Sequence, residues 1–227
     1  MTPYKAALRG AFLTVLTLFG GLLAGLAAGD LVFHLIPGSS LEDVKLGHAA
    51  IAALPALVGF LAGGAAWGVQ MGRLAGNTET RRLSLAGMLG FGPITILLAV
   101  GLGLAEPAIV GYLGAFGQPV YRVFTLLFVP SAFIIAGVGA WVVGRGLGDP
   151  KLARNLFWQV GLTAALTFLV VNLMMESLGW VIGAPNAAKR LTMLTVLALG
   201  DFTAAITGGA VMGWKLTRKK DEKDARR

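Results

Sequence analysis

Long apolar segments separated by short polar loops are the feature of this sequence that most constrains its fold. A helix that spans a membrane needs roughly 20 consecutive apolar residues. Six such segments can be marked, at about 11–36, 48–71, 84–110, 121–144, 155–182 and 190–214. With 56% hydrophobic and only 13% charged residues, the 227-residue chain is too apolar for a soluble domain. The sequence therefore predicts an all-α integral membrane protein with six transmembrane helices in a single membrane domain, residues 1–227.

The distribution of basic residues predicts how these helices are oriented. Lys and Arg are enriched in the cytoplasmic loops of membrane proteins. Fifteen of them fall at the two termini and in the two loops on the same side, whereas four fall on the other side: Lys45, Arg122, Lys189 and Arg190. This asymmetry predicts a multi-pass protein of a bacterial inner membrane, with both termini and a charged tail (215–227) in the cytoplasm. Because topology explains the net charge of +8, no nucleic-acid partner is predicted.

Tryptophans near the ends of the apolar segments agree with this orientation. Trp and Tyr side chains are enriched at the two interfaces of a membrane. We expect four tryptophans at the inner interface: Trp67, Trp141, Trp158 and Trp214.

An acidic residue followed by a glycine-rich segment recurs three times at nearly constant spacing. The separations are 33, 31 and 32 residues, for Asp30 to Gly63, Glu106 to Gly137 and Glu176 to Gly208. A fixed period of this kind indicates an internal repeat. It predicts three tandem helical hairpins, which we interpret as parallel pseudo-repeats at about 11–73, 84–146 and 155–218.

Glycines at four-residue intervals predict close helix packing. Small residues with this spacing form a groove along one helix face, into which a neighbouring backbone can fit. The series are Gly21, Gly25 and Gly29; Gly59 and Gly63; Gly64, Gly68 and Gly72; and Gly209 and Gly213. A glycine-lined pore or cofactor surface is the alternative, although no cofactor is predicted.

Asp201 is the strongest candidate for a functional residue. It lies about 16 Å of helix from Arg190 and a similar distance from Lys215, so we expect it near the middle of the membrane. A charge at that depth costs a few kcal/mol, so the side chain should face the interior of the bundle, be protonated or have a partner. On the preceding segment, Asn172 and Glu176 share one helix face and could extend a polar ladder from the outer edge to Asp201. A protonated, hydrogen-bonded structural acid is the alternative.

The acids Asp30, Glu106 and Glu176 are predicted near the outer boundary of the hydrocarbon. One interpretation is a ring of carboxylates that attracts a cation or proton, because acidic rings favour cations in pores. The other is that the acids are hydrated at the interface or neutralised by nearby cations. A third is hydrogen bonding to a partner subunit.

Two histidines lie close to the first of these acids. Asp30 and His34 are four residues apart on one helix face, and His48 begins the next segment. Oxygen and imidazole ligands suit several transition metals, so these three residues are a possible metal site. Interfacial histidines with a simple local contact are the commoner outcome. The sequence has no cysteines, which excludes thiolate sites and disulfides.

The hairpins resemble, in pattern, the proteolipid subunits of rotary ATPases, which also combine one membrane carboxylate with a glycine-rich helix. Here Asp30, Glu106 and Glu176 lie nearer the outer edge, in the helix that precedes the glycine motif, so no residue role is carried over.

These observations favour a small transporter or channel, linked to a cation or to protons, that uses intramembrane carboxylates. The alternative is a non-catalytic structural or assembly subunit of a larger membrane complex, with other subunits or a second copy as partners. A Walker loop, a nucleophile elbow and a zincin helix are absent from the sequence, so an enzyme is the less favoured class.

Overall fold

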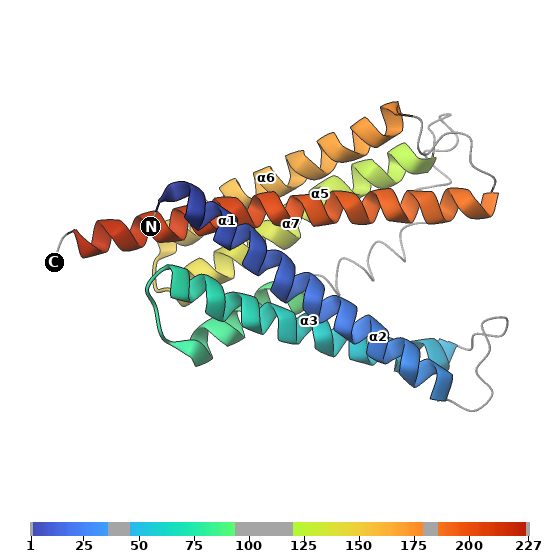
Figure 1. Cartoon of the computed structure of the whole chain (residues 1–227), viewed down its shortest axis with the longest axis horizontal. Coiled ribbons are helices and arrows are strands. Elements are labelled where there is room, and N and C mark those ends of the chain that lie inside the picture. The colour runs from blue at the N-terminus through green and yellow to red at the C-terminus, as the bar shows by residue number, and fades with distance from the viewer. Residues whose placement is uncertain (1, 36–45, 94–119, 179–185, 226–227) are drawn as a thin grey trace.

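The computed structural model describes residues 2–35, 46–93, 120–178 and 186–225, and in these ranges every regular element is a helix (Figure 1). The first rod is continuous and consists of α1 (Pro3–Thr14), the π-helical segment η1 (Val15–Phe19) and α2 (Gly20–Leu35). It is followed by α3 (Leu46–Leu74), a helix over 80–93, α5 (Val120–Gly146), α6 (Pro150–Ser177) and α7 (Asn186–Asp224). The described residues thus form six helical rods. We call the end where α1 begins and α7 finishes the terminal end, and the opposite one the far end.

Four helices in the described part of the chain are long and apolar enough to cross a membrane: Pro3–Val32, Leu127–Gly146, Pro150–Ser177 and Thr195–Glu222. The outer surface fits such an environment, because large apolar side chains such as Leu8, Phe12 and Leu23 are exposed along the first rod. A soluble monomer rarely exposes so much contiguous apolar surface. The predicted all-helical, membrane-embedded class is confirmed at this level.

Local sequence signals explain where two of the helices begin. Pro3 follows Thr2, whose side-chain oxygen accepts a hydrogen bond from the Lys5 backbone N–H at 3.4 Å. Asp149 caps α6 in the same way and precedes Pro150. Proline suits the first helical turn because that turn needs no backbone donor, and Ser, Thr, Asp and Asn are preferred caps.

The six rods pack as a closed ring. α1 packs on α7, α2 on α3, α5 on α6 and α6 on α7. The helix over 80–93 completes the ring, because its Gly87 lies against Gly64 and Gly68 of α3 and its Gly90 lies against Gly139 of α5. α7 also contacts α3 and α5. Figure 1 shows the first rod running from α7 at the terminal end to α3 at the far end. The α5–α6 contact joins the second predicted hairpin to the third.

Glycine lets the first rod approach both of its neighbours at backbone distance. A Cβ atom on Gly10 would lie 2.7 Å from the Cα of Gly213 on α7, and one on Gly21 would lie 2.9 Å from the Cα of Gly63 on α3. Real Cβ atoms essentially never show separations under 3.0 Å, so any side chain here would force the helices apart. The glycine series found in the sequence thus lie at helix–helix contacts, as small residues in membrane helices commonly do.

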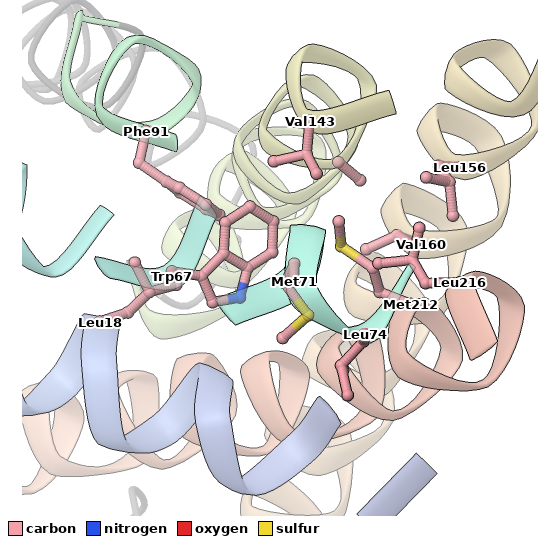
Figure 2. Packing of buried hydrophobic residues seen from close by; sticks show 11 residues of the cluster. Leu18, Trp67, Met71, Leu74, Phe91, Val143, Leu156, Val160, Met212 and Leu216 are labelled. Atoms are coloured by element: carbon pink, nitrogen blue, oxygen red, sulfur yellow. The ribbon is translucent and has the colours of Figure 1, made fainter. Parts of the chain in front are cut away.

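The largest buried cluster lies toward the terminal end. Figure 2 shows Trp67 and Met71 of α3 facing Met212 and Leu216 of α7, with Phe91 and Val143 close by. Trp67 is only 2% exposed and packs edge-on against Phe91, with 4.7 Å between the ring centroids. Its predicted place at the membrane interface is therefore wrong, because the side chain points into the bundle. The other three tryptophans assigned to that interface are exposed: Trp141, Trp158 and Trp214.

An ion pair fixes the terminal half of α7 to the loop between α5 and α6. The Lys219 Nζ lies 2.6 Å from Asp149 Oδ2, and both side chains are about two-thirds buried. A backbone hydrogen bond from Leu152 lowers the pKa of Asp149, and the Lys219 ammonium lowers it further. α7 itself continues to Asp224, so most of the predicted tail over 215–227 extends the helix.

Candidate functional site

A cavity of about 260 Å³ lies at the centre of the helix ring. All six rods contribute to its wall. The lining residues, in chain order, are Thr14, Leu18, Phe19, Leu22, Phe60, Trp67, Phe91, Ala132, Ile135, Ala136, Val160, Ala164, Asp201, Ala204, Ala205, Gly208 and Gly209. Most are aliphatic or aromatic, and pockets for small molecules are typically apolar with a few polar groups that fix the ligand.

Asp201 is the one charged residue among the described residues that line this cavity. It lies well inside α7, about 22 Å of helix from Asn186 and about 21 Å from Lys215. The side chain keeps an exposed surface, and no described residue forms a hydrogen bond or an ion pair with it. A carboxylate in apolar surroundings is costly unless it is neutralised or paired. Asp201 thus lies in the middle of α7 and on the cavity wall, and the functional role predicted for it from the sequence stays a prediction.

Thr14 and Trp67 form the polar part of the cavity floor. The Trp67 indole Nε1–H donates to Thr14 Oγ1 at 2.9 Å, and the Thr14 hydroxyl donates to the Gly10 carbonyl oxygen at 2.8 Å. A hydroxyl has one proton and two lone pairs. The proton of Thr14 is therefore committed, and one of its lone pairs is occupied. Gly209 faces the Thr14 side chain so closely that a Cβ there would overlap it.

The π-helical segment η1 shapes the wall next to this floor. The Gly20 backbone N–H bonds to the Val15 carbonyl, five residues earlier, so this turn holds one residue more than an α-turn. Gly10 and Gly21 are close to three regular turns apart and would otherwise face the same neighbour. The extra residue rotates the helix, so that Gly10 meets α7 and Gly21 meets α3. Single π-turns are frequent at functional sites.

The buried cluster of Figure 2 closes the cavity toward the terminal end. Met71 lies one helical turn beyond Trp67 on α3, and Met212 one turn beyond Gly208 on α7. Both methionines are fully buried. In this conformation, then, packed side chains separate Asp201 from the terminal end.

The remaining predicted members of the polar ladder lie on α6. Asn172 is fully buried, and its Nδ2 donates to the Phe168 carbonyl oxygen at 2.8 Å. Its side chain packs against Gly200, the neighbour of Asp201. Glu176 lies one turn farther along α6, close to its end at Ser177, and is partly buried. The structure thus places Asn172 beside the part of α7 that carries Asp201. The polar ladder of the three residues stays a prediction.

The first outer acid forms a local contact at the end of α2. His34 Nδ1 lies 2.8 Å from the Asp30 backbone oxygen and 3.7 Å from its carboxylate Oδ1, and both side chains are exposed. His48 falls in α3, but its side chain lies outside the described residues. In the part of the chain that the structure describes, no group of three acidic or histidine side chains converges on a metal position. The predicted metal site stays a prediction.

The predicted ring of outer acids is also only partly visible. Glu106 lies outside the described residues. Asp30 and Glu176 are carried by the far ends of α2 and α6, which Figure 1 shows apart from one another. Their entrance role remains a prediction.

Sequence reasoning missed the aromatic residues of the cavity. Phe19, Phe60, Trp67 and Phe91 come from three different rods and line one space. Each lies in a stretch of apolar residues, where no periodicity separates a cavity-facing ring from one that faces lipid. One available signal was Thr14, a hydroxyl inside the first apolar segment.

Comparison with protein-family models, with curated protein sequences and with solved structures gave no match.

Proposed function

We propose that this protein is a small membrane transporter, linked to a cation or to protons, in which Asp201 is the binding carboxylate. The observation that carries the proposal is the position of Asp201, the one acid among the described residues on the wall of a mainly apolar cavity inside a helix ring. Ionisable residues within membrane segments commonly belong to substrate or ion pathways. A cation or a proton would neutralise the carboxylate at a depth where water cannot.

The finer topology belongs to the same proposal. We infer that all six rods cross a bacterial inner membrane as three hairpins, with the terminal end in the cytoplasm. The closed ring supports this, since each rod packs against at least two others within one chain. The basic residues at the terminal end support the orientation, among them Arg73, Arg145 and Lys219. Because the ring closes within one chain, the proposed pathway runs through a single subunit.

A transporter fits the packing better than an open channel does. The cavity is blocked at the terminal end by the buried cluster around Trp67 and Met71. A substrate bound at Asp201 can leave on that side only if these side chains move. Alternating access requires a conformation in which the binding site is closed on one side, and the buried cluster closes the site on the terminal side.

The test is uptake into proteoliposomes made with the purified full chain. An imposed proton gradient should drive substrate movement in the wild-type protein and in Glu222→Gln, whose exposed carboxyl lies on the terminal helix and pairs with Arg218 at 3.1 Å. Asp201→Asn keeps the shape of the side chain but cannot ionise, and should abolish or uncouple flux. Equal flux in Asp201→Asn and wild type, at equal amounts of folded protein, would contradict the assignment.

A further inference from the structure

The described side chains of the cavity wall offer too few oxygen atoms to bind a bare metal ion. Calcium takes six to eight oxygen ligands and magnesium needs six in near-ideal geometry. Among the described side chains that line the cavity, only Asp201 and Thr14 carry oxygen. The proton of Thr14 is donated to Gly10 and one lone pair accepts from Trp67, so this hydroxyl can add at most one ligand. An inorganic cation would lose most of its hydration shell here without replacement.

The same wall suits a cation whose charge is surrounded by carbon. Four aromatic rings line the cavity, and a ring face attracts a cation within about 6 Å of its centroid. A quaternary or aryl ammonium ion needs no ligand oxygens, because its methyl groups contact apolar walls while the carboxylate balances its charge. Such ions are the ligands that aromatic cages recognise.

The size of the cavity limits the ligand. A protein cavity of about 150 Å³ accepts benzene. At the same cavity volume for each ligand atom, a cavity of about 260 Å³ accommodates roughly ten non-hydrogen atoms. Phenyltrimethylammonium has this size, and tert-butylbenzene is its neutral counterpart of nearly the same shape.

We propose that the Asp201 cavity binds a small lipophilic organic monocation, held by the one carboxylate and by the aromatic wall, in competition with a proton. This inference rests on the proposed transport function and specifies its substrate class. The competition follows from the lining, since no described residue of the wall other than Asp201 can titrate. Glu176 and Asn172 lie on α6 beyond the residues that line the cavity.

The binding test uses radiolabelled phenyltrimethylammonium and the full chain in detergent. Asp201→Asn should weaken binding at least tenfold, and Asp201→Glu should retain part of it. Phe19→Leu or Phe60→Leu should weaken it roughly two- to thirty-fold, the range expected for one cation–π contact. Phe12→Leu is the matched control, because Phe12 lies on the same rod as Phe19 but is 64% exposed outside the cavity. It should bind like the wild-type protein.

Displacement of the labelled probe by other compounds identifies the chemical class of the ligand. The inference requires that unlabelled probe displaces the label, that acidification weakens binding, and that sodium, potassium and tert-butylbenzene displace little. Displacement by sodium, potassium or calcium would overturn it in favour of an inorganic ion. Equal displacement by tert-butylbenzene, with no effect of Asp201→Asn, would overturn it in favour of a neutral apolar ligand. If Phe12→Leu weakened binding of the probe as much as Phe19→Leu does, the effect would not be specific to the aromatic residues of the cavity wall, which would contradict the inference.

Proteoliposome uptake separates this inference from the proposed function. Uptake of the probe that depends on Asp201 supports both. Binding without uptake supports the ligand class and contradicts transport. Proton or sodium flux that depends on Asp201, in protein that does not bind the probe, leaves transport standing and overturns the ligand class. The Phe19 and Phe60 variants keep the test valid if Asp201→Asn fails to fold.

Discussion

Gly10 is a position where a single added methyl group should strongly disturb the helix ring. In Gly10→Ala the new Cβ would overlap the Gly209 carbonyl oxygen and lie 2.7 Å from the Gly213 Cα. Both are backbone atoms, so no side chain can rotate away. α1 and α7 would have to separate until contacts of at least 3.0 Å are restored.

The magnitude of this effect can be isolated with a second alanine on the same rod. Overpacking a tight contact costs about 1–3 kcal/mol. Replacing a helical glycine by alanine also gains up to about 1 kcal/mol of helix propensity. A Cβ atom on Gly20 would meet no heavy atom within 4 Å, so Gly20→Ala should show only the gain. The difference in unfolding free energy between the two variants is then the steric term alone, about 1–3 kcal/mol.

The assay is reversible unfolding by SDS in mixed micelles, followed by tryptophan fluorescence. The absence of cysteine from the sequence also allows two spin labels to be attached, at Leu8 of α1 and Arg218 of α7, to report the separation of the helices. Gly10→Ala should unfold at lower SDS and lengthen this distance, whereas Gly20→Ala should do neither. Equal stability and equal distances in the two variants would refute the reasoning.

Three further predictions concern the terminal end. Asp149→Ala should lower the unfolding free energy by about 1 kcal/mol, because it removes the α6 cap. Asp149→Asn keeps a cap and should lose only the ion pair with Lys219, about 0.5 kcal/mol; unfolding in SDS measures both variants. Because the pKa of Asp149 is depressed in the folded protein, its stabilisation is present above its unfolded value near 4 and is lost as pH falls through the folded pKa; an acid titration of stability should show this in wild type and not in Asp149→Asn. Trp67→Phe removes the hydrogen bond to Thr14, so it should lower the unfolding free energy by about 0.5–1.5 kcal/mol and increase proton leak in liposomes. Trp141→Phe, at a 41% exposed site, should change neither quantity.

The helical class, the helix-contact glycines and the central acid were predictable because each leaves a direct mark on the sequence. Apolar length predicts a membrane helix whatever it packs against, and glycines four residues apart mark one helix face. Asp201 is conspicuous because a carboxylate in the middle of an apolar membrane segment is costly unless it is protonated, paired or turned toward the bundle interior. These signals depend on residue type and spacing alone.

The position of Trp67 and the shape of the cavity could not be predicted in this way. A tryptophan near the end of a helix gives the same pattern whether it faces the interface or the core. The position of Trp67 follows from its packing against Phe91 and its hydrogen bond to Thr14, which come from two other rods. The π-turn of η1 has no diagnostic residue, yet it determines which neighbour each half of the first rod meets. The aromatic wall depends on that rotation, since Phe19 lies within η1 and Phe60 comes from α3, the rod against which η1 and α2 pack.

The sharing of the first rod between two neighbours has a consequence for how the protein is made. α2 can pack on α3 soon after both are synthesised, but α1 has to wait for the terminal half of α7. About 200 residues separate Gly10 from its partner Gly213, so at about 5–20 residues per second this wait lasts roughly 10–40 s. During that interval the glycine face of α1 is without its partner, and the floor of the cavity, where Thr14 meets Gly209, is assembled last.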